Sequence, residues 1–576
     1  MVWNYHFNRS FEMKLKNIIL AAGVFFASTL FTACDDYLER YPLDQPSDVT
    51  FWSTEAELKM AINAVYRSLY WTDRSTATAL NTHLPFQFLF DFATDLSWDR
   101  NLNAWQLMGQ GQVTAVENSL VFGAWNNAYA QIGNCNRLLA YMHRAEEVTN
   151  PQVYASIAAE ARFFRAYWYH WLISLYGDVP LITDPLDPGE SALPRTGKDE
   201  VYRFIVDELD AAGAVLPVEY AANERGRATR GAALALKARA ALFAGDWATA
   251  AAAAKSVIDL NKYSLYPDYD KLFTYEGQNN TEEIFTIQFS RTNQMVHETP
   301  VHVRGRLAGG YVTKIPTQAL VDSYECIDGL RIDKSPLYNP AKPFENRDPR
   351  LYATIVHPGS VFLGYQFETH PDSLTIWDYN QTPARRVGNQ EVTNPYATFS
   401  GYMYRKYVSS DTREFRLQSE LNVMLFRYAE MLLTYAEAQI ELGHLDESVY
   451  TAINSVRTRA GMPAITPGKS ADELRKIVRH ERKVEFVFEG HRFFDIRRWK
   501  IAEHVMPGPL YGRPLREYKS KYIPRFDEYG TPRYEAYASE LRMFDTRFFN
   551  PAKDYLLPIP QRERDINPNL TQNPLY

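Results

Sequence analysis

Apolar residues recur at intervals of three and four positions along most of this chain, the spacing that places them on one face of an α-helix. The first such segment opens at Ser53 and carries Leu58, Ile62 and Val65 on its apolar face. The same periodicity predicts further helices over 119–148, 153–176, 199–215, 229–243, 247–260, 421–442, 446–460, 471–487 and 490–505. The sequence therefore predicts a mostly α fold.

Two pairs of the predicted helices are joined by tight turns of the same kind. In each turn a glycine is placed to end the first helix in the left-handed conformation, and an aspartate begins the second. Alanines line both predicted contact faces, which lets the helix backbones approach closely. These features are typical of tetratricopeptide-like hairpins, so we expect the hairpins to stack into one scaffold. The two hairpins are 230–260, turning at Gly245-Asp246, and 426–460, turning between Gly443 and Asp446.

Three regions, 71–118, 262–420 and 506–576, break the helical pattern. They contain clusters of Pro, Gly and Asn, with short strand-like runs such as 283–287. Loops of this length inside a compact protein are usually functional. We therefore expect a loop-rich, irregular cap formed by these regions, seated on a helical scaffold of about 51–260 and 421–505, the whole forming a single unit over 51–576.

A leader precedes the helical part of the chain. After Met13, two lysines lead into an apolar run over 18–31, and small residues then precede Cys34. This is the layout of a secretory signal, and the run is too short to span a bilayer as a mature helix. We expect a signal peptide over 1–33, with 1–12 an over-extended start, then a lipidated Cys34 and a tether over 34–50. The alternative is an ordinary cleaved signal with an accidental cysteine.

Composition narrows the class of partner. The net charge of -7 is spread over 23% charged residues, so no basic field favours nucleic acid. Besides Cys34 the chain has only Cys135 and Cys326, too few for a disulfide framework, and their pairing is not readable from sequence. Aromatic residues make up 14% of the chain. Such rings serve both helix packing and stacking on sugar rings.

Signatures of catalysis and metal binding are missing from the sequence. It contains no HExxH, no CxxC pair, no GxSxG and no phosphate-binding glycine loop. Glu430 and Glu437 lie one heptad apart beside Arg427, which favours ion pairs of the scaffold. In 481–499, acids and bases alternate with aromatics at helical spacing, which predicts a partly buried ion network. We therefore expect no catalytic residue, no metal site and no cofactor.

Several motifs, taken together, resemble the SusD/RagB family. Any one of them is weak, but they occur in the order of the family across nearly the whole mature chain. The closing Leu575-Tyr576 departs from the glycine-tyrosine ending usual in that family. The motifs are the lipidation signal, RFFRAYW to LYGDVPL over 162–181, FRYAEMLLTYAEA over 426–438, RTRAG over 457–461, the block over 481–499, and LPIP to QNP over 557–574.

The resemblance implies a surface lipoprotein of Bacteroidetes-type bacteria that captures a nutrient, most often a glycan, without transforming it. It also implies a partner, a SusC-like TonB-dependent transporter of the outer membrane, on which the protein sits as a lid. Asp35-Asp36 after Cys34 is similar to an acidic tag associated with surface export in those bacteria. The same aspartates also suit a solvated tether.

Glycan capture needs aromatic faces for the apolar side of a sugar and polar groups for its hydroxyls. Segment 95–105 interleaves both kinds in a predicted loop, and in starch-binding members of the family the corresponding loop supplies an aromatic platform. We therefore expect ligand contacts at Trp98, Asn101 and Trp105, with anchoring of the loop to the core as the alternative for Trp105. Further expected contacts are Arg74, Arg306, Tyr311, Trp377 and Tyr379.

Other functions remain open at this point. A charged pocket around Arg74, Arg100 and Arg306 favours capture of peptides, as in RagB-like proteins. A helical glycoside hydrolase requires two carboxyl groups about 5 to 9.5 Å apart across a cleft. A lid without any ligand is the third alternative.

Overall fold

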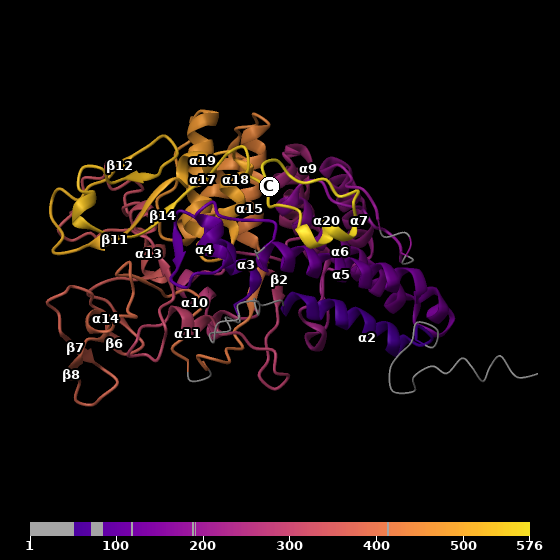
Figure 1. Cartoon of the computed structure of the whole chain (residues 1–576), viewed down its shortest axis with the longest axis horizontal. Coiled ribbons are helices and arrows are strands. Elements are labelled where there is room, and N and C mark those ends of the chain that lie inside the picture. The colour runs from indigo at the N-terminus through magenta and orange to yellow at the C-terminus, as the bar shows by residue number, and fades with distance from the viewer. Residues whose placement is uncertain (1–50, 71–83, 117–118, 187–188, 190–191, 412–413) are drawn as a thin grey trace, which may run out of the picture.

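The computed structural model of the chain describes residues 51–70, 84–116, 119–186, 189, 192–411 and 414–576. It is mostly helical, as the sequence predicts. Long helices gather on one side of the molecule, while loops and short strands gather on the other (Figure 1). The signal peptide, Cys34, the tether and Arg74 lie outside the described residues.

The first half of the scaffold is a row of neighbouring helices. α6 packs between α5 and α7, and α8 packs between α7 and α9. Short helix-to-helix connections give antiparallel neighbours of this kind. The helices of this half are α2 (Glu55–Tyr66), α5 (Ser119–Tyr141), α6 (Pro151–Tyr176), α7 (Lys198–Val215), α8 (Arg230–Ala244) and α9 (Trp247–Asp259).

The second half continues the same row, although more than 160 residues separate it from the first along the chain. α9 packs directly against α15, and α15 in turn contacts α16 and α17. The two halves are thus joined in space, and the residues between them leave the row and return to it. The helices of this half are α15 (Tyr428–Glu441), α16 (Glu447–Arg459), α17 (Ala471–Glu485), α18 (His491–Arg498) and α19 (Ala502–Val505).

Both predicted hairpin turns are confirmed. Gly245 adopts the left-handed conformation with φ 77°, and the Asp246 side chain accepts from the backbone N–H of Thr249 at the start of α9. Gly443 has φ 78°, and Asp446 accepts from the N–H of Ser448 at the start of α16. Only a residue without a Cβ adopts such φ values without steric cost, so the glycines set where the helices stop.

Three predicted helices need correction. Residues 423–427 form a strand, β10 (Val423–Arg427), and the helix begins only at Tyr428. The run VMLFR is apolar without interruption, a pattern that fits a buried strand as well as a helix. The helix predicted over 119–148 ends at Tyr141 and continues as a 3-10 helix over Met142–Val148. The helix predicted over 490–505 is interrupted between α18 and α19.

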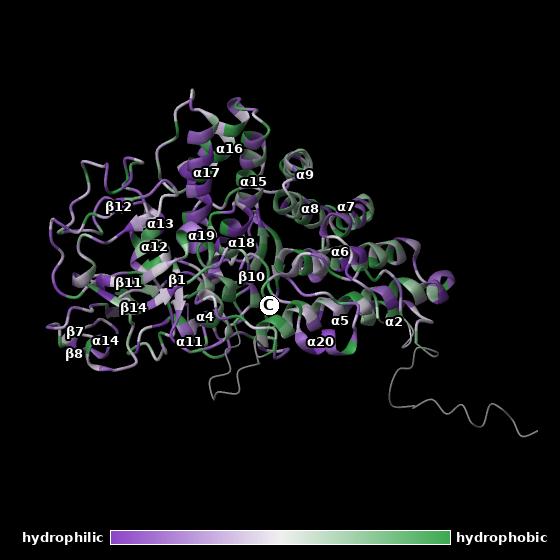
Figure 2. Cartoon of the chain, turned by 45° about the horizontal axis from the view of Figure 1, so that its top comes forward, coloured by the Kyte–Doolittle hydropathy of each residue, from purple (hydrophilic) through white to green (hydrophobic). Residues whose placement is uncertain are grey.

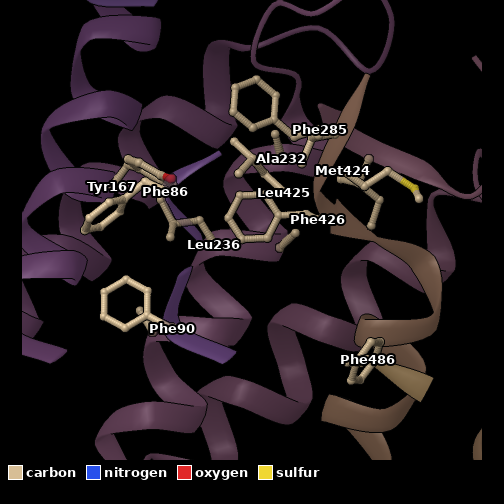
Figure 3. Close-up of a cluster of buried hydrophobic side chains, with 14 of the residues drawn as sticks. Phe86, Phe90, Tyr167, Ala232, Leu236, Phe285, Met424, Leu425, Phe426 and Phe486 are labelled. Carbon is tan, nitrogen blue, oxygen red and sulfur yellow. The ribbon is translucent and has the colours of Figure 1, made fainter. Parts of the chain in front are cut away.

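β10 pairs antiparallel with β2 (Glu283–Ile287), and this ribbon sits against the helical row. Figure 3 shows Phe285, Met424 and Phe426 of the ribbon beside Ala232 and Leu236 of α8. Phe285 and Phe426 are 2% and 1% exposed, with their rings stacked at a centroid distance of 6.3 Å. The ribbon is therefore part of the core and not of the cap.

The predicted ion network is confirmed in the centre of the protein. Arg427 at the end of β10 forms ion pairs with Glu282, Glu485 and Glu489 at 2.7 to 2.8 Å. Glu485 lies on α17, a predominantly hydrophilic helix in Figure 2 that is nevertheless buried along one side. Burial of such a helix is possible because its charges are paired.

The cap is built from short elements of three chain regions. β1 (Ser97–Asp99) pairs with β3 (Lys314–Pro316), and β11 (Gly508–Pro514) pairs with β14 (Leu541–Arg547), so distant segments hold one another. The remaining strands are β4 (Ile355–Val356), β5 (Val361–Phe362), β6 (Tyr365–Gln366), β7 (Thr375–Asp378), β8 (Arg385–Gly388), β9 (Met403–Tyr404), β12 (Arg525–Phe526) and β13 (Pro532–Arg533). The short helices are α3 (Phe86–Leu89), α4 (Ala104–Gly109), α10 (Tyr269–Leu272), α11 (Thr299–Val303), α12 (Gln318–Ser323), α13 (Pro349–Thr354) and α14 (Gln390–Thr393). The last helix, α20 (Gln561–Ile566), lies instead against the scaffold beside α5 (Figure 1).

Candidate functional site

Trp98 lies inside the protein, and its segment is a strand instead of the predicted loop. The residue sits in β1 opposite Ile315 of β3 and is 3% exposed. Its ring packs on Phe399 and Phe544 at centroid distances of 5.6 and 5.0 Å, and its Nε1 donates to Oδ2 of Asp545 at 2.9 Å. In this conformation the ring faces are covered by protein, so contact between Trp98 and a ligand stays a prediction.

Trp105 is also buried, at 1% exposure, on the short helix α4. Its ring meets Phe86 and Phe90 edge-on at 5.6 and 5.0 Å. The Asn103 side chain begins the helix by accepting from the N–H of Trp105. This is the anchoring arrangement that the sequence left open for Trp105, and it fastens the segment carrying Arg100 and Asn101 to the core.

Several other predicted residues come together on the surface of the cap. Arg100 donates from its guanidinium to the carbonyl oxygens of Tyr311, at 3.0 Å, and Tyr396. The guanidinium of Arg306 donates to the carbonyl oxygen of Gly310, the residue before Tyr311, at 3.0 Å. Asn101 follows Arg100, half-buried, and its backbone N–H donates to Asp99. The structure therefore brings Arg100, Arg306 and Tyr311 to one place.

Aromatic and basic side chains that the sequence did not single out complete this surface. The Arg100 guanidinium lies over the rings of Tyr396 and Phe399 at 5.5 and 5.8 Å, and that of Arg542 lies over Phe399 at 5.2 Å. Tyr396 is 61% exposed, so its ring is open to solvent. We call the surface formed by Arg100, Asn101, Arg306, Tyr311, Tyr396, Phe399 and Arg542 the Arg100 face.

Tyr396, Phe399 and Arg542 lie in other regions of the chain, on the loop after α14 and on β14. One signal was available for the first two, because 394–402, NPYATFSGY, is a loop-like segment rich in aromatics. Nothing in the sequence connects that loop to Arg100. The connection is made by the carbonyl of Tyr396, which accepts from Arg100.

Positive charge dominates the Arg100 face. Burial lowers the pKa of Arg100, and the neighbouring charge of Arg306 lowers it further. Two carboxylates oppose this lowering: Asp99, which is buried and paired with Lys314, and Glu391, which is buried and accepts from the backbone N–H of Arg306. Burial raises the pKa of Glu391, although the hydrogen bond from the Arg306 backbone and the charges of Arg306 and Arg100 act to lower it.

Trp377 and Tyr379 form the exposed pair that the sequence predicted. Trp377 lies on β7 of the four-stranded sheet β5-β6-β7-β8, Tyr379 directly follows that strand, and the two residues are 39% and 49% exposed. Their ring centroids lie 6.5 Å apart, with the ring planes inclined by 30°. Arg386 on β8 lies over the Trp377 ring at 5.3 Å. Their use by a ligand stays a prediction.

The carboxylates of the scaffold serve ion pairs. Glu430 pairs with Arg239 at 2.6 Å, and Glu437 pairs with Arg498 at 2.6 Å, so both belong to the scaffold as expected. Glu325, His480 and Glu481 bring potential metal ligands to within 4.8 Å of one another. Arg457 already pairs with both of these glutamates, and this cationic neighbour opposes the entry of a metal ion.

Cys135 and Cys326 are both free and buried, so they do not form a disulfide. Among the residues described, no helix combines the length and the apolar composition needed to cross a membrane.

The sequence matches two protein families. Residues 278–576 match the SusD family, and residues 36–242 match the family described as "Starch-binding associating with outer membrane". The chain is similar over nearly its full length to SusD-like protein P2 of Formosa agariphila, with 26% identity over 94% of this chain and 96% of that protein. It is also similar to a SusD-like protein of Bacteroides ovatus, with 24% identity over 98% of each chain.

Solved structures have the same fold. A SusD-like carbohydrate binding protein from Bacteroides fragilis superposes with a TM-score of 0.79 and 30% identity, covering 91% of this chain and all of that one. Surface glycan-binding protein A from Bacteroides thetaiotaomicron, solved in complex with laminarihexaose, superposes with a TM-score of 0.62 and 22% identity over 90% of this chain and 99% of that one. This protein belongs to the SusD family.

Proposed function

We propose that this protein is a nutrient-binding lipoprotein of the outer-membrane surface that holds an oligosaccharide at the Arg100 face. The observation that carries the proposal is the open ring of Tyr396 beside the fixed guanidinium groups of Arg100 and Arg306. An exposed ring and donors at its edge are the two elements that a sugar requires. The similarity to the SusD-like carbohydrate binding protein from Bacteroides fragilis, at 30% identity, supports the choice of ligand class.

The face is already ordered before a ligand arrives. Arg100 is held by two backbone carbonyls, and its own backbone N–H donates to Thr313 at 2.8 Å. A side chain fixed in this way loses little conformational entropy on binding, so weak contacts suffice to hold a sugar. Asn101 and the hydroxyl of Tyr311 supply further polar groups for hydroxyls.

The direct test is a binding screen on residues 35–576 with glycan oligosaccharides and peptides, read by calorimetry. Tyr396→Ala removes the open ring, and we expect at least about a tenfold loss of affinity, equivalent to the loss of one stacking contact. Ile566→Ala, 70% exposed on α20, is the matched surface control and is expected to bind normally. Full affinity in Tyr396→Ala contradicts the proposed site.

Binding without chemistry is part of the proposal. Each bound oligosaccharide is expected to be recovered unchanged after prolonged incubation, as judged by mass spectrometry. Release of shorter products from any glycan favours the alternative of a helical glycoside hydrolase.

The proposal also includes anchoring and delivery. A lipid on Cys34 holds the protein on the outer membrane, and the ligand passes to a SusC-like TonB-dependent transporter. The family that residues 36–242 match is described as associating with the outer membrane, which supports a location at that membrane. Cys34→Ala is expected to release the protein in soluble form, whereas continued membrane association contradicts the anchor. The partner is tested by copurification. We expect a TonB-dependent barrel to copurify with the native lipoprotein and not with the Cys34→Ala variant.

A further inference from the structure

The guanidinium groups of Arg100 and Arg306 are side by side, because they donate to the consecutive carbonyls of Tyr311 and Gly310. Each group has five N–H donors, and backbone carbonyls take two from Arg100 and one from Arg306. The Nε of Arg306 is buried without a partner. Two adjacent cations thus retain most of their donors for a further acceptor.

Within the described part of the chain, none of the guanidinium groups of Arg100, Arg306 and Arg542 forms an ion pair with a carboxylate, although the backbone N–H of Arg306 donates to Glu391. The arginines of the central ion network behave differently. Arg350 alone pairs with Asp348, Glu481 and Glu485. A half-buried positive pair without a counter-ion is electrostatically incomplete, and it gains most from a ligand that brings negative charge.

Glu391 does not complete the pair. One of its oxygens is used by the backbone N–H of Arg306, and the other is buried without a partner. Its position therefore fixes the 304–311 turn, while the two guanidinium groups stay available to a ligand.

A third cation extends the same surface. Arg542 is exposed and shares the ring of Phe399 with Arg100. One N–H of Arg542 donates to the carbonyl oxygen of Thr398 at 3.3 Å, and its remaining donors suit the oxygens of a carboxylate or sulfate. The exposed Tyr396 beside it offers the flat contact for the sugar that carries the anionic group.

We propose that the Arg100 face selects an anionic glycan, whose carboxylate or sulfate group binds between Arg100 and Arg306, over a neutral glycan of the same size. This inference rests on the proposed function and adds the class of sugar to it. Uronic acids and sulfated sugars share this chemistry, because each supplies at least two anionic acceptor oxygens to the guanidinium N–H groups.

The test uses residues 35–576 and pairs of probes that differ only in charge. Oligogalacturonate is compared with its methyl ester, and a sulfated galactan oligosaccharide with its desulfated form. We expect the charged member of at least one pair to bind at least about tenfold more tightly, the factor that one charge-assisted hydrogen bond supplies. The pair that shows the preference identifies the group as carboxylate or sulfate.

Arg306→Gln and Arg542→Gln are expected to reduce that preference, and Arg542→Gln is the safer variant because its side chain is exposed. Arg562→Gln removes the same charge from α20 and is expected to leave the preference unchanged. Affinity for the charged glycan is expected to fall with added salt.

Equal binding of charged and neutral members overturns the anionic preference while leaving glycan binding intact. Failure of every glycan to bind instead overturns the proposed function itself. Tighter binding of a hexaglutamate peptide than of any anionic glycan assigns the face to acidic peptides and contradicts the inference.

Discussion

The indole Nε1 of Trp98 donates to Oδ2 of Asp545 at 2.9 Å, although the two residues are 447 positions apart in the chain. The other oxygen of Asp545 accepts from Gln110 at 2.8 Å. One carboxylate thereby connects β1, the end of α4 and β14 beneath the Arg100 face. Trp98 supports that face from the inside, whatever further contact it makes with a ligand.

Trp98→Ala is expected to lower the free energy of unfolding by about 3 to 5 kcal/mol, the usual cost of removing a buried tryptophan ring. Chemical denaturation of residues 35–576 measures this change. Trp377→Ala is the matched control, because its ring is 39% exposed and its loss should change stability by no more than about 0.5 kcal/mol. Equal effects of the two substitutions contradict the burial of Trp98.

Arg427→Met is expected to destabilise the protein by about 3 to 5 kcal/mol, because it leaves three buried carboxylates without their shared cation. Lys59→Met breaks an exposed pair on α2 and is expected to leave stability unchanged. Urea unfolding of both variants provides the comparison. If Arg427→Met is as stable as the parent protein, the ion network contributes nothing to the fold.

The same network predicts loss of stability in acid. Burial alone raises the pKa of Glu489, but the charges of Arg427 and Lys406 outweigh it and hold the pKa below its ordinary value. A carboxyl with a lowered pKa in the folded state contributes stability above its unfolded pKa of about 4.3, and this contribution is lost as the pH falls through the folded pKa. The urea concentration at the midpoint of unfolding, measured from pH 6 to pH 2, is expected to decrease once the pH is below about 4. The decrease is expected to be less steep in Glu489→Gln.

Asp91 is expected to show the opposite dependence. Burial raises its pKa to about 7, although its carboxylate accepts from the backbone N–H of Gly490 at 3.0 Å. A carboxyl with a raised pKa loses its contribution as the pH rises from the unfolded value toward 7. Asp91→Asn, which keeps an acceptor, should therefore be the more stable protein at pH 8, by more than about 1 kcal/mol. At pH 4 this advantage is expected to disappear, and a difference independent of pH contradicts the assignment.

Gly490→Ala is expected to be strongly destabilising. Gly490 has φ 82°, and a Cβ there lies 2.2 Å from the carbonyl oxygen of Gln87, which is backbone and cannot move aside. Gly443→Ala separates the two effects, because Gly443 has φ 78° but open space around its Cβ position. We expect Gly443→Ala to cost about 1 to 2 kcal/mol from backbone strain alone, and Gly490→Ala to cost more. Thermal unfolding measures both, and equal losses contradict the close contact.

The long helices were predictable because their signals are local. The glycine and aspartate of each hairpin turn lie within a few residues of each other in the sequence, and they set the observed helix ends at Gly245 and Gly443. β10 was not predictable in this way. Its apolar run is short, and only the antiparallel partner β2, far back in the chain, decides that it is a strand.

The candidate site was predictable in part. The resemblance to the family pointed to Asn101, Arg306 and Tyr311. The carbonyl of Tyr311 accepts from the guanidinium of Arg100, Arg306 donates to the adjacent carbonyl of Gly310, and Asn101 follows Arg100 in the chain. The burial of Trp98 depends on Phe544 and Asp545, and the open ring of the site comes from Tyr396. These pairings arise from tertiary contacts between distant segments, for which one sequence carries no signal.

The register of β2 and β10 places Ile287 opposite Val423. The segment between these two residues therefore leaves the helical row and returns to it at the same place, as the loop of a β-hairpin does. The length of such a segment can change without any change in the path of the scaffold helices, provided that its contacts with the rest of the protein are matched, among them the ion pairs of Arg350 with Glu481 and Glu485 on α17. Related chains can in this way differ in the surface that the inserted segment presents while they keep the same helical scaffold.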